Sequence, residues 1–265
     1  TLNRVNTGNL FAALPIEKYL PETFRDFNAE TSGTLKLTGL PNAVSGTADI
    51  RAGAGTVAGE QFDGFETKLA FAGNSVNIEK FEARFGDGLL TASGNYQRDT
   101  TVFDFNVTGK NIPASRLRPF IPNSKDLPNF SGTIDLTAKA TGRGEDFKTY
   151  DINFSGIGSD ITINQNQLGT INFVGKTENQ ILRADLTANL GGQPQVVTTT
   201  VNFGDDNLPF RAETNFNQTE LAPYIALLQP PGSVAITGRA TGRVYAEGNL
   251  YAKDASGKGQ FTTDN

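Results

Sequence analysis

Apolar and polar residues alternate along most of this 265-residue chain, and no other feature of the sequence constrains the fold as much. Leu182, Ala184 and Leu186, for example, alternate with Arg183 and Asp185. Successive side chains of a β-strand point to opposite faces, so a period of two predicts strands with one apolar and one polar face. We therefore expect an all-β protein, built as a long antiparallel meander of such strands.

Turn signals separate the expected strands. The chain has 29 glycines and 12 prolines, which is typical of a β-protein with many turns. The sequence "GDG" at 86–88 predicts a tight hairpin, because Asp and Gly tolerate the positive φ angles of such turns. In "VNIEKFEARF" (76–85) the alternation changes phase near Lys80, which indicates a β-bulge.

One Gly-anchored strand returns about every hundred residues. Its copies are "SGTLKLTG", "SGTIDLTA" and "GSVAITG", with the anchoring glycines Gly33, Gly132 and Gly232. Each copy follows a proline-containing stretch with a helical pattern, and we expect short helices between the repeats at 10–20, 112–121 and 219–228.

This recurrence predicts stacked repeats. We expect a first repeat with its preceding helix over 1–111, a second over 112–217, and the start of a third over 218–265. An array that stops inside a unit suggests a piece of a longer protein.

Composition argues against several classes of function. The chain contains no Cys, His, Met or Trp, so thiolate metal sites, disulfides and the usual general base are absent. Lys and Arg number 23 and Asp and Glu 28, scattered without long runs, which does not favour nucleic-acid binding. We expect no enzymatic activity, no cofactor and no metal site. No apolar stretch approaches the 18 residues typical of a membrane-spanning helix.

Two glycine-rich motifs are interpreted as structural. "RAGAGTVAG" (51–59) misses the spacing of a nucleotide-binding loop and no amphipathic helix follows it, so a strand is favoured. "GDDN" (204–207) offers carboxylates but lacks the ligand series of a calcium loop, so a hairpin turn is favoured.

A sheet with one apolar face must hide that face. Three short helices cannot cover some 15 to 20 strands. A closed sandwich or barrel would solve the problem, and so would a sheet curled around its apolar face into an elongated trough. Stacked repeats favour the trough, because each unit then contacts only its neighbours.

The strands "GTLKLTGLPNAVSG" and "GTIDLTAKATG", and the hairpin "VNIEKFEARFGDGLLTASGNY", resemble those of the AsmA-like and TamB-type proteins of the bacterial envelope. These proteins include the translocation and assembly module and are related in design to the bridge-like lipid-transfer proteins. The similarity extends over nearly the whole chain but consists of glycines and alternation rather than chemical motifs.

This resemblance implies a repeating β-groove, or β-taco, in the periplasm, anchored in the inner membrane through a segment outside this sequence. It implies a conduit for phospholipid between the inner and outer membranes that serves outer-membrane biogenesis. Moving an acyl chain of about 16 carbons into water costs about 12 kcal/mol, at about 0.8 kcal/mol per CH₂. A continuous apolar path lowers that barrier without a catalytic residue.

The groove lining is expected to consist of the apolar members of the alternating strands, although plain core packing explains each of them equally well. These residues are Leu35, Leu37, Leu69, Phe71, Val76, Ile78, Phe103, Phe105, Ile134, Leu136, Ile152, Phe154, Ile171, Phe173, Leu182, Leu186, Phe210 and Phe216.

Two alternatives remain open at this point. One is a structural or adhesive repeat protein whose packed interior binds nothing. The other is a scaffold for outer-membrane protein assembly, which would dock a β-barrel assembly partner by donating an edge strand near Phe261.

Overall fold

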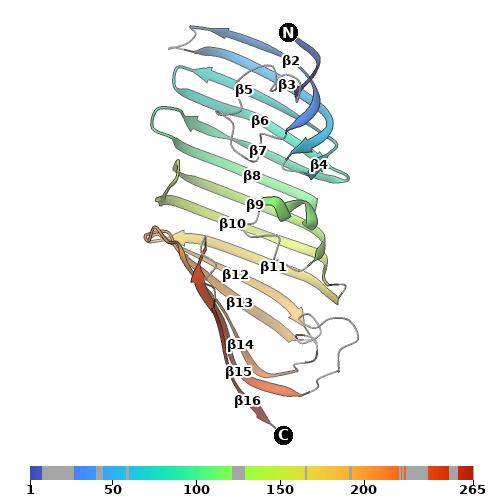
Figure 1. Cartoon of the computed structure of the whole chain (residues 1–265), viewed down its shortest axis with the longest axis vertical. Coiled ribbons are helices and arrows are strands. Elements are labelled where there is room, and N and C mark those ends of the chain that lie inside the picture. Colours follow the sequence, from blue (N-terminus) through green and yellow to red (C-terminus); the bar gives the residue numbers. More distant parts are fainter. Residues whose placement is uncertain are drawn as a thin grey trace. The chain divides into compact units, whose positions relative to one another are not determined.

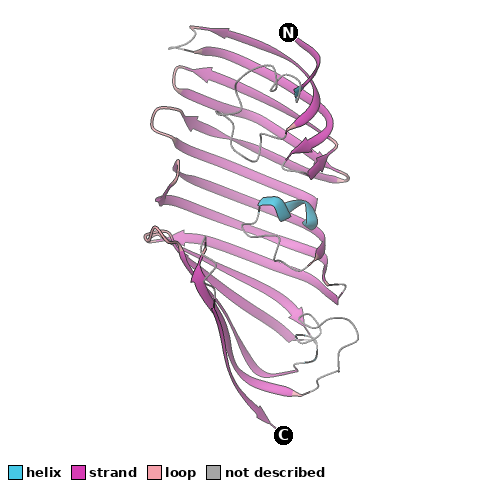
Figure 2. Ribbon diagram, viewed as in Figure 1, coloured by secondary structure: helices cyan, strands magenta, loops and turns pink. Residues whose placement is uncertain are grey.

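The chain is all-β. The computed structural model describes residues 1–7, 27–39, 44–57, 60–120, 129–164, 166–190, 193–220, 222, 224, 238–250 and 256–264. Sixteen antiparallel strands form one sheet and account for most of the described chain (Figure 2). Each strand pairs with its sequence neighbours, except that β4 branches from β3 and β5 follows β3 in the sheet (Figure 1). The meander expected from the alternation is therefore confirmed.

Two compact units share the strands. Unit 1 comprises Thr1–Ile121 and Thr137–Gly144, and unit 2 comprises Pro122–Leu136 and Glu145–Asn265. The strand β9 (Phe130–Arg143) contributes to both units. The expected repeats over 1–111, 112–217 and 218–265 stay a prediction.

Eight strands lie wholly in unit 1. They are β1 (Leu2–Asn6), β2 (Asn28–Thr38), β3 (Ser45–Val57), β4 (Glu60–Phe62), β5 (Gly64–Ala72), β6 (Ser75–Phe85), β7 (Gly88–Gln97) and β8 (Val102–Pro113).

Seven strands lie wholly in unit 2. They are β10 (Asp146–Ile163), β11 (Asn166–Glu178), β12 (Ile181–Leu190), β13 (Gln193–Asn202), β14 (Pro209–Glu220), β15 (Arg239–Asn249) and β16 (Ser256–Asp264).

Turns and the bulge occur where the sequence indicates them. Gly86, with φ of 63°, turns the chain between β6 and β7, as "GDG" predicts. In β6, Ile78 pairs with Leu69 and Lys80 with Lys68, so Glu79 is the extra residue of a bulge. The motif at 51–59 belongs to β3 as far as residue 57, and 204–207 connects β13 to β14.

The repeated glycines at two of the three copies allow neighbouring strands to approach closely. A Cβ added to Gly33 would lie 3.1 Å from the Cα of Ile50 and closer still to the carbonyl oxygen of Asp49. At Gly132 it would lie 2.7 Å from the carbonyl oxygen of Ser159. The two residues therefore have the same role in β2 and β9, which explains why glycine recurs there. Gly232 lies outside the described residues.

The expected short helices are not seen as such. Within 112–121 the described chain forms only a 3-10 helix, over Ala114–Phe120, and Ile112 still belongs to β8. Pro119 cannot donate a backbone hydrogen bond, which disfavours a regular α-helix there. The stretch 10–20 lies outside the described residues, as does most of 219–228, whose first two residues continue β14.

Replacing Gly33 with alanine should destabilise unit 1, because the new methyl group would overlap the backbone of β3. We expect a loss of about 1–3 kcal/mol in the free energy of unfolding, measured by urea denaturation. Gly53→Ala is the matched control, since a Cβ at Gly53 would lie 3.9 Å from its nearest neighbour, the carbonyl oxygen of Glu30. Equal stability of the two variants would contradict the close-approach explanation.

Candidate functional site

The register of unit 1 gathers its apolar residues on one face. Directly paired residues of antiparallel strands point to the same side, so chains of pairs define rows across the sheet. We define the apolar face of unit 1 by four such rows: Leu35–Ala48–Leu69–Ile78–Gly94–Phe105, Leu37–Gly46–Phe71–Val76–Tyr96–Phe103, Gly33–Ile50–Thr67–Phe81–Ala92–Val107 and Thr31–Ala52–Phe65–Ala83–Leu90–Gly109.

Unit 2 has a corresponding apolar face. Its strands β10–β15 pair so that glycine, alanine, threonine and larger apolar residues line up, with a single glutamine. We define this face by four rows: Thr177–Leu182–Val201–Phe210–Gly248, Phe154–Gly175–Ala184–Thr199–Ala212–Ala246, Gly156–Phe173–Leu186–Val197–Thr214–Val244 and Gly158–Ile171–Ala188–Gln195.

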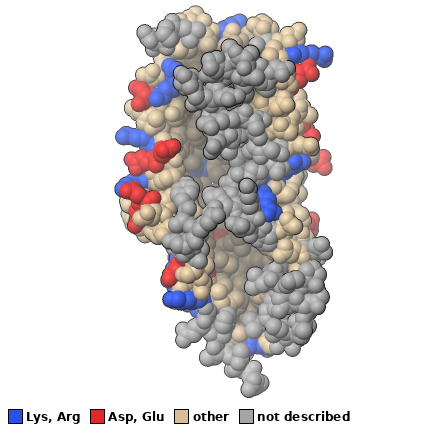
Figure 3. Space-filling view, in the orientation of Figure 1, with Lys and Arg blue, Asp and Glu red and all other residues tan. Residues whose placement is uncertain are grey.

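Charged side chains occupy the opposite, polar face of each unit and form ion pairs across strands. In unit 1, Glu66 on β5 accepts from Lys80 on β6 and lies 3.6 Å from Arg51 on β3. In unit 2, Glu213 accepts from Arg243 and, at 3.1 Å, from Arg211. Most charged side chains visible in Figure 3 gather along the margins of that view. Each unit therefore separates an ion-paired face from an uncharged one.

These hydrogen bonds shift the pKa values of the bridging carboxyls. The hydrogen bond from Lys80 lowers the pKa of Glu66, and those from Arg243 and Arg211 lower the pKa of Glu213. The same contacts raise the pKa of Lys80 and of Arg243. The effect stabilises the charged forms and thereby the pairing of the strands that carry them.

Two packed clusters cover part of the apolar faces. In unit 1, Ala29, Ala52 and Phe62 are buried, and the partly buried Phe27 and Phe65 pack against them. In unit 2, the buried residues Val201, Phe203 and Leu208 contact a surrounding set of partly buried side chains: Phe147, Tyr150, Ile152, Leu182, Phe210 and Leu250. Sequence reasoning misses both clusters because they join residues from strands and turns far apart in the chain.

Elsewhere, the residues that the structure describes leave large side chains of the apolar faces exposed. Leu35 in unit 1 is 49% exposed and Leu186 in unit 2 is 39% exposed, although both point to the apolar side. Large apolar side chains that are exposed within a continuous apolar surface mark a site where another molecule binds. These open regions are therefore the candidate site.

The structure places the residues expected to line a groove as follows. All eight from unit 1 share two adjacent rows of its apolar face. Phe154, Ile171, Phe173 and Leu186 share the apolar face of unit 2 outside the packed cluster.

The other members differ in their surroundings. Ile152, Leu182 and Phe210 pack against the cluster of unit 2, and Phe216 is buried edge-on against Tyr224, with ring centroids 5.1 Å apart. Burial raises the pKa of Tyr224. Ile134 and Leu136 are half-buried on β9. That these residues line a lipid groove stays a prediction.

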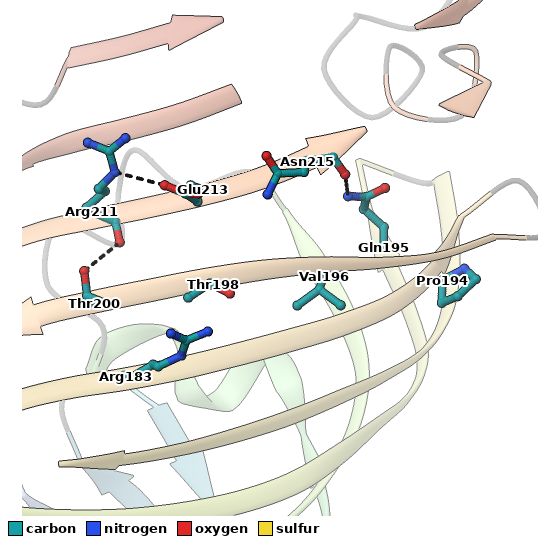
Figure 4. A pocket seen from close by; sticks show the side chains of 9 residues that line it. All are labelled: Arg183, Pro194, Gln195, Val196, Thr198, Thr200, Arg211, Glu213 and Asn215. Carbon is teal, nitrogen blue, oxygen red and sulfur yellow. Dashed lines mark hydrogen bonds and ion pairs between the residues drawn. The ribbon is translucent and has the colours of Figure 1, made fainter. Parts of the chain in front are cut away.

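Three hollows among the described residues lie mainly on the polar faces, and none of the expected lining residues borders them. Their volumes are about 510, 240 and 580 Å³. In the first, Arg183, Thr198 and Arg211 project from neighbouring strands (Figure 4). Its cations already have carboxylate partners, Arg183 with Asp185 at 3.6 Å and Arg211 with Glu247 at 3.0 Å. This hollow is therefore a poor site for an anion.

The described ranges contain no group of three acidic side chains placed to hold a metal ion. Among the same residues, no helix has the length and hydropathy required to cross a membrane. No protein-family model, curated protein or solved structure matches this chain.

Replacing Glu213 with glutamine should lower the melting temperature at neutral pH. The folded-state pKa of Glu213 lies below its ordinary value of 4.5, so its stabilising effect is complete above about pH 4.5 and disappears as the pH falls through the folded pKa. The wild type and E213Q should therefore converge in acid. Thermal melts from pH 3 to 7 measure this, with Glu145→Gln in an exposed turn as the control. A constant difference across the range would contradict the ion-pair explanation.

Proposed function

We propose that this chain is part of a non-catalytic lipid conduit of the cell envelope, in which phospholipid acyl chains lie on the apolar face and head groups remain in water. The supporting observation is the row structure: within each unit, cross-strand pairing makes an uncharged surface that includes exposed leucines. A hydrocarbon chain gains about 0.8 kcal/mol for each CH₂ that it buries there. The resemblance to AsmA-like and TamB-type proteins supports the same proposal and a periplasmic location.

A structural repeat protein with a packed interior is the second candidate. The clusters around Phe62 and Phe203 favour it, because they show that parts of both apolar faces are filled by protein. The two candidates differ in lipid content. Native mass spectrometry and solvent extraction of the purified chain should release phospholipid only from a conduit.

Adding a charge to an exposed position of the apolar face should reduce bound lipid while the protein remains folded. Leu35→Asp and Leu186→Asp suit this test, because both side chains are partly in water and an aspartate there can stay hydrated. We expect phospholipid per mole of protein to fall several-fold, because an acyl chain would have to displace water from a carboxylate.

Asn106→Asp and Asn172→Asp are the matched controls, since they add the same charge to exposed positions of the polar faces. They should retain the lipid of the wild type. A wild-type chain without lipid, or equal lipid in all four variants, would refute the proposed function.

A further inference from the structure

Two phenylalanine–glycine pairs cross each other on the apolar face of unit 2. The sequences are "NFSG" in β10, with Phe154 and Gly156, and "NFVG" in β11, with Phe173 and Gly175. The register pairs Phe154 directly with Gly175 and Phe173 directly with Gly156. The two ring centroids are 6.3 Å apart.

Both rings lie over the glycine of the facing strand. A Cβ on Gly175 would be 2.6 Å from Cε1 of Phe154, and one on Gly156 would be 2.7 Å from Cε2 of Phe173. Such separations are shorter than any normal contact between carbon atoms, so the ring occupies the volume that a side chain would fill. Gly175 is itself buried. Each phenylalanine ring therefore packs against the backbone of the neighbouring strand instead of projecting away from the sheet.

Unit 1 repeats the arrangement with Phe105 and Gly94. These two residues pair directly, and a Cβ on Gly94 would be 2.5 Å from Cδ1 of Phe105. Phe103 stacks on Phe105 with ring centroids 5.5 Å apart. The recurrence of the same contact in both units indicates a shared role.

A ring in this position has two consequences for the surface. It covers the polar backbone of a glycine-containing strand with apolar carbon, and it leaves the space above the sheet free. In unit 2 that space is open to solvent as far as the described residues show, since Leu186 pairs directly with Phe173 and is 39% exposed. The described rows that surround it carry no charged side chain. An uncharged occupant matches this surface.

We infer that Phe154 and Phe173 form the surface on which an extended acyl chain of a phospholipid lies, and that Gly175 and Gly156 are positioning residues that keep the two rings flat. This inference rests on the proposed function and makes it specific. A methyl group on either glycine would lift the ring into the space that the acyl chain uses.

The test uses the full chain and a phosphatidylethanolamine with a photoactivatable diazirine in one acyl chain. After irradiation, peptide mapping locates the cross-links. In the wild type we expect labels on the peptides that contain Phe154 and Phe173. In Gly175→Ala these labels should fall about fivefold, equivalent to about 1 kcal/mol of lost binding, while labels near Phe105 in unit 1 persist.

Gly257→Ala is the matched control. Gly257 pairs with Ala246 and so extends the row of Gly175, but a Cβ there would lie 3.8 Å from its nearest neighbour, the carbonyl oxygen of Tyr245. The cross-links in the Gly257→Ala variant should equal those in the wild type. If Gly175→Ala folds poorly, as judged by its melting temperature, Phe154→Leu removes the flat ring without adding an atom to the glycine and should show the same loss.

The possible results separate this inference from the proposed function. Unchanged labelling in Gly175→Ala, or in Phe154→Leu where that variant replaces it, would show that the rings only shield the backbone. Labels confined to unit 1 would overturn the inference and leave the conduit standing. A wild-type chain without any label on its apolar faces would overturn both.

Discussion

Everything in this fold depends on strand register. The side-chain period of a strand is two, so a slip by one residue would turn every apolar residue of that strand into water and bring charges such as Lys68 or Arg183 to the apolar side. Several contacts oppose such a slip. The β2 backbone approaches β3 closely at Gly33, and Glu213 joins β14 to β15 through Arg243. The polar face thus helps to fix the position of the apolar one, although its exposed ion pairs each contribute little to stability.

The bulge in β6 shows how one face is kept continuous. Val76 and Ile78 alternate in one phase and Phe81 and Ala83 in the other, so an unbroken strand would send the two pairs to opposite sides. Because Glu79 is the extra residue, both pairs lie on the apolar face of unit 1, opposite Phe71, Leu69, Thr67 and Phe65 of β5. A local irregularity therefore restores the alternation across the sheet, which is why the phase change is a reliable sign of a bulge and not of a strand end.

The sequence predicts much of this structure because its main signal is local. Alternation, turn residues and the phase change near Lys80 were sufficient for the strands, the hairpin at 86–88 and the bulge. The helical pattern at 112–121 was misleading, because Pro119 cannot donate the backbone hydrogen bond that a regular α-helix needs, and the chain forms a short 3-10 helix there. The rows across the sheet, the cluster around Phe203 and the ring of Phe154 over Gly175 depend on pairing between distant residues, and no local pattern encodes them.

The division of each apolar face into filled and open parts follows from competing physical demands. A single sheet gains stability by burying apolar side chains, and the cluster of Val201, Phe203 and Leu208 does so with residues from the end of β13 and the turn that follows it. If the whole face were filled in this way, nothing could bind to it. The glycines in the open part have the opposite effect, since they allow Phe154 and Phe173 to bury ring area against the backbone without occupying the space above. Aromatic residues can thus stabilise a face and leave it accessible at the same time, which is the combination that a surface for mobile hydrocarbon chains requires.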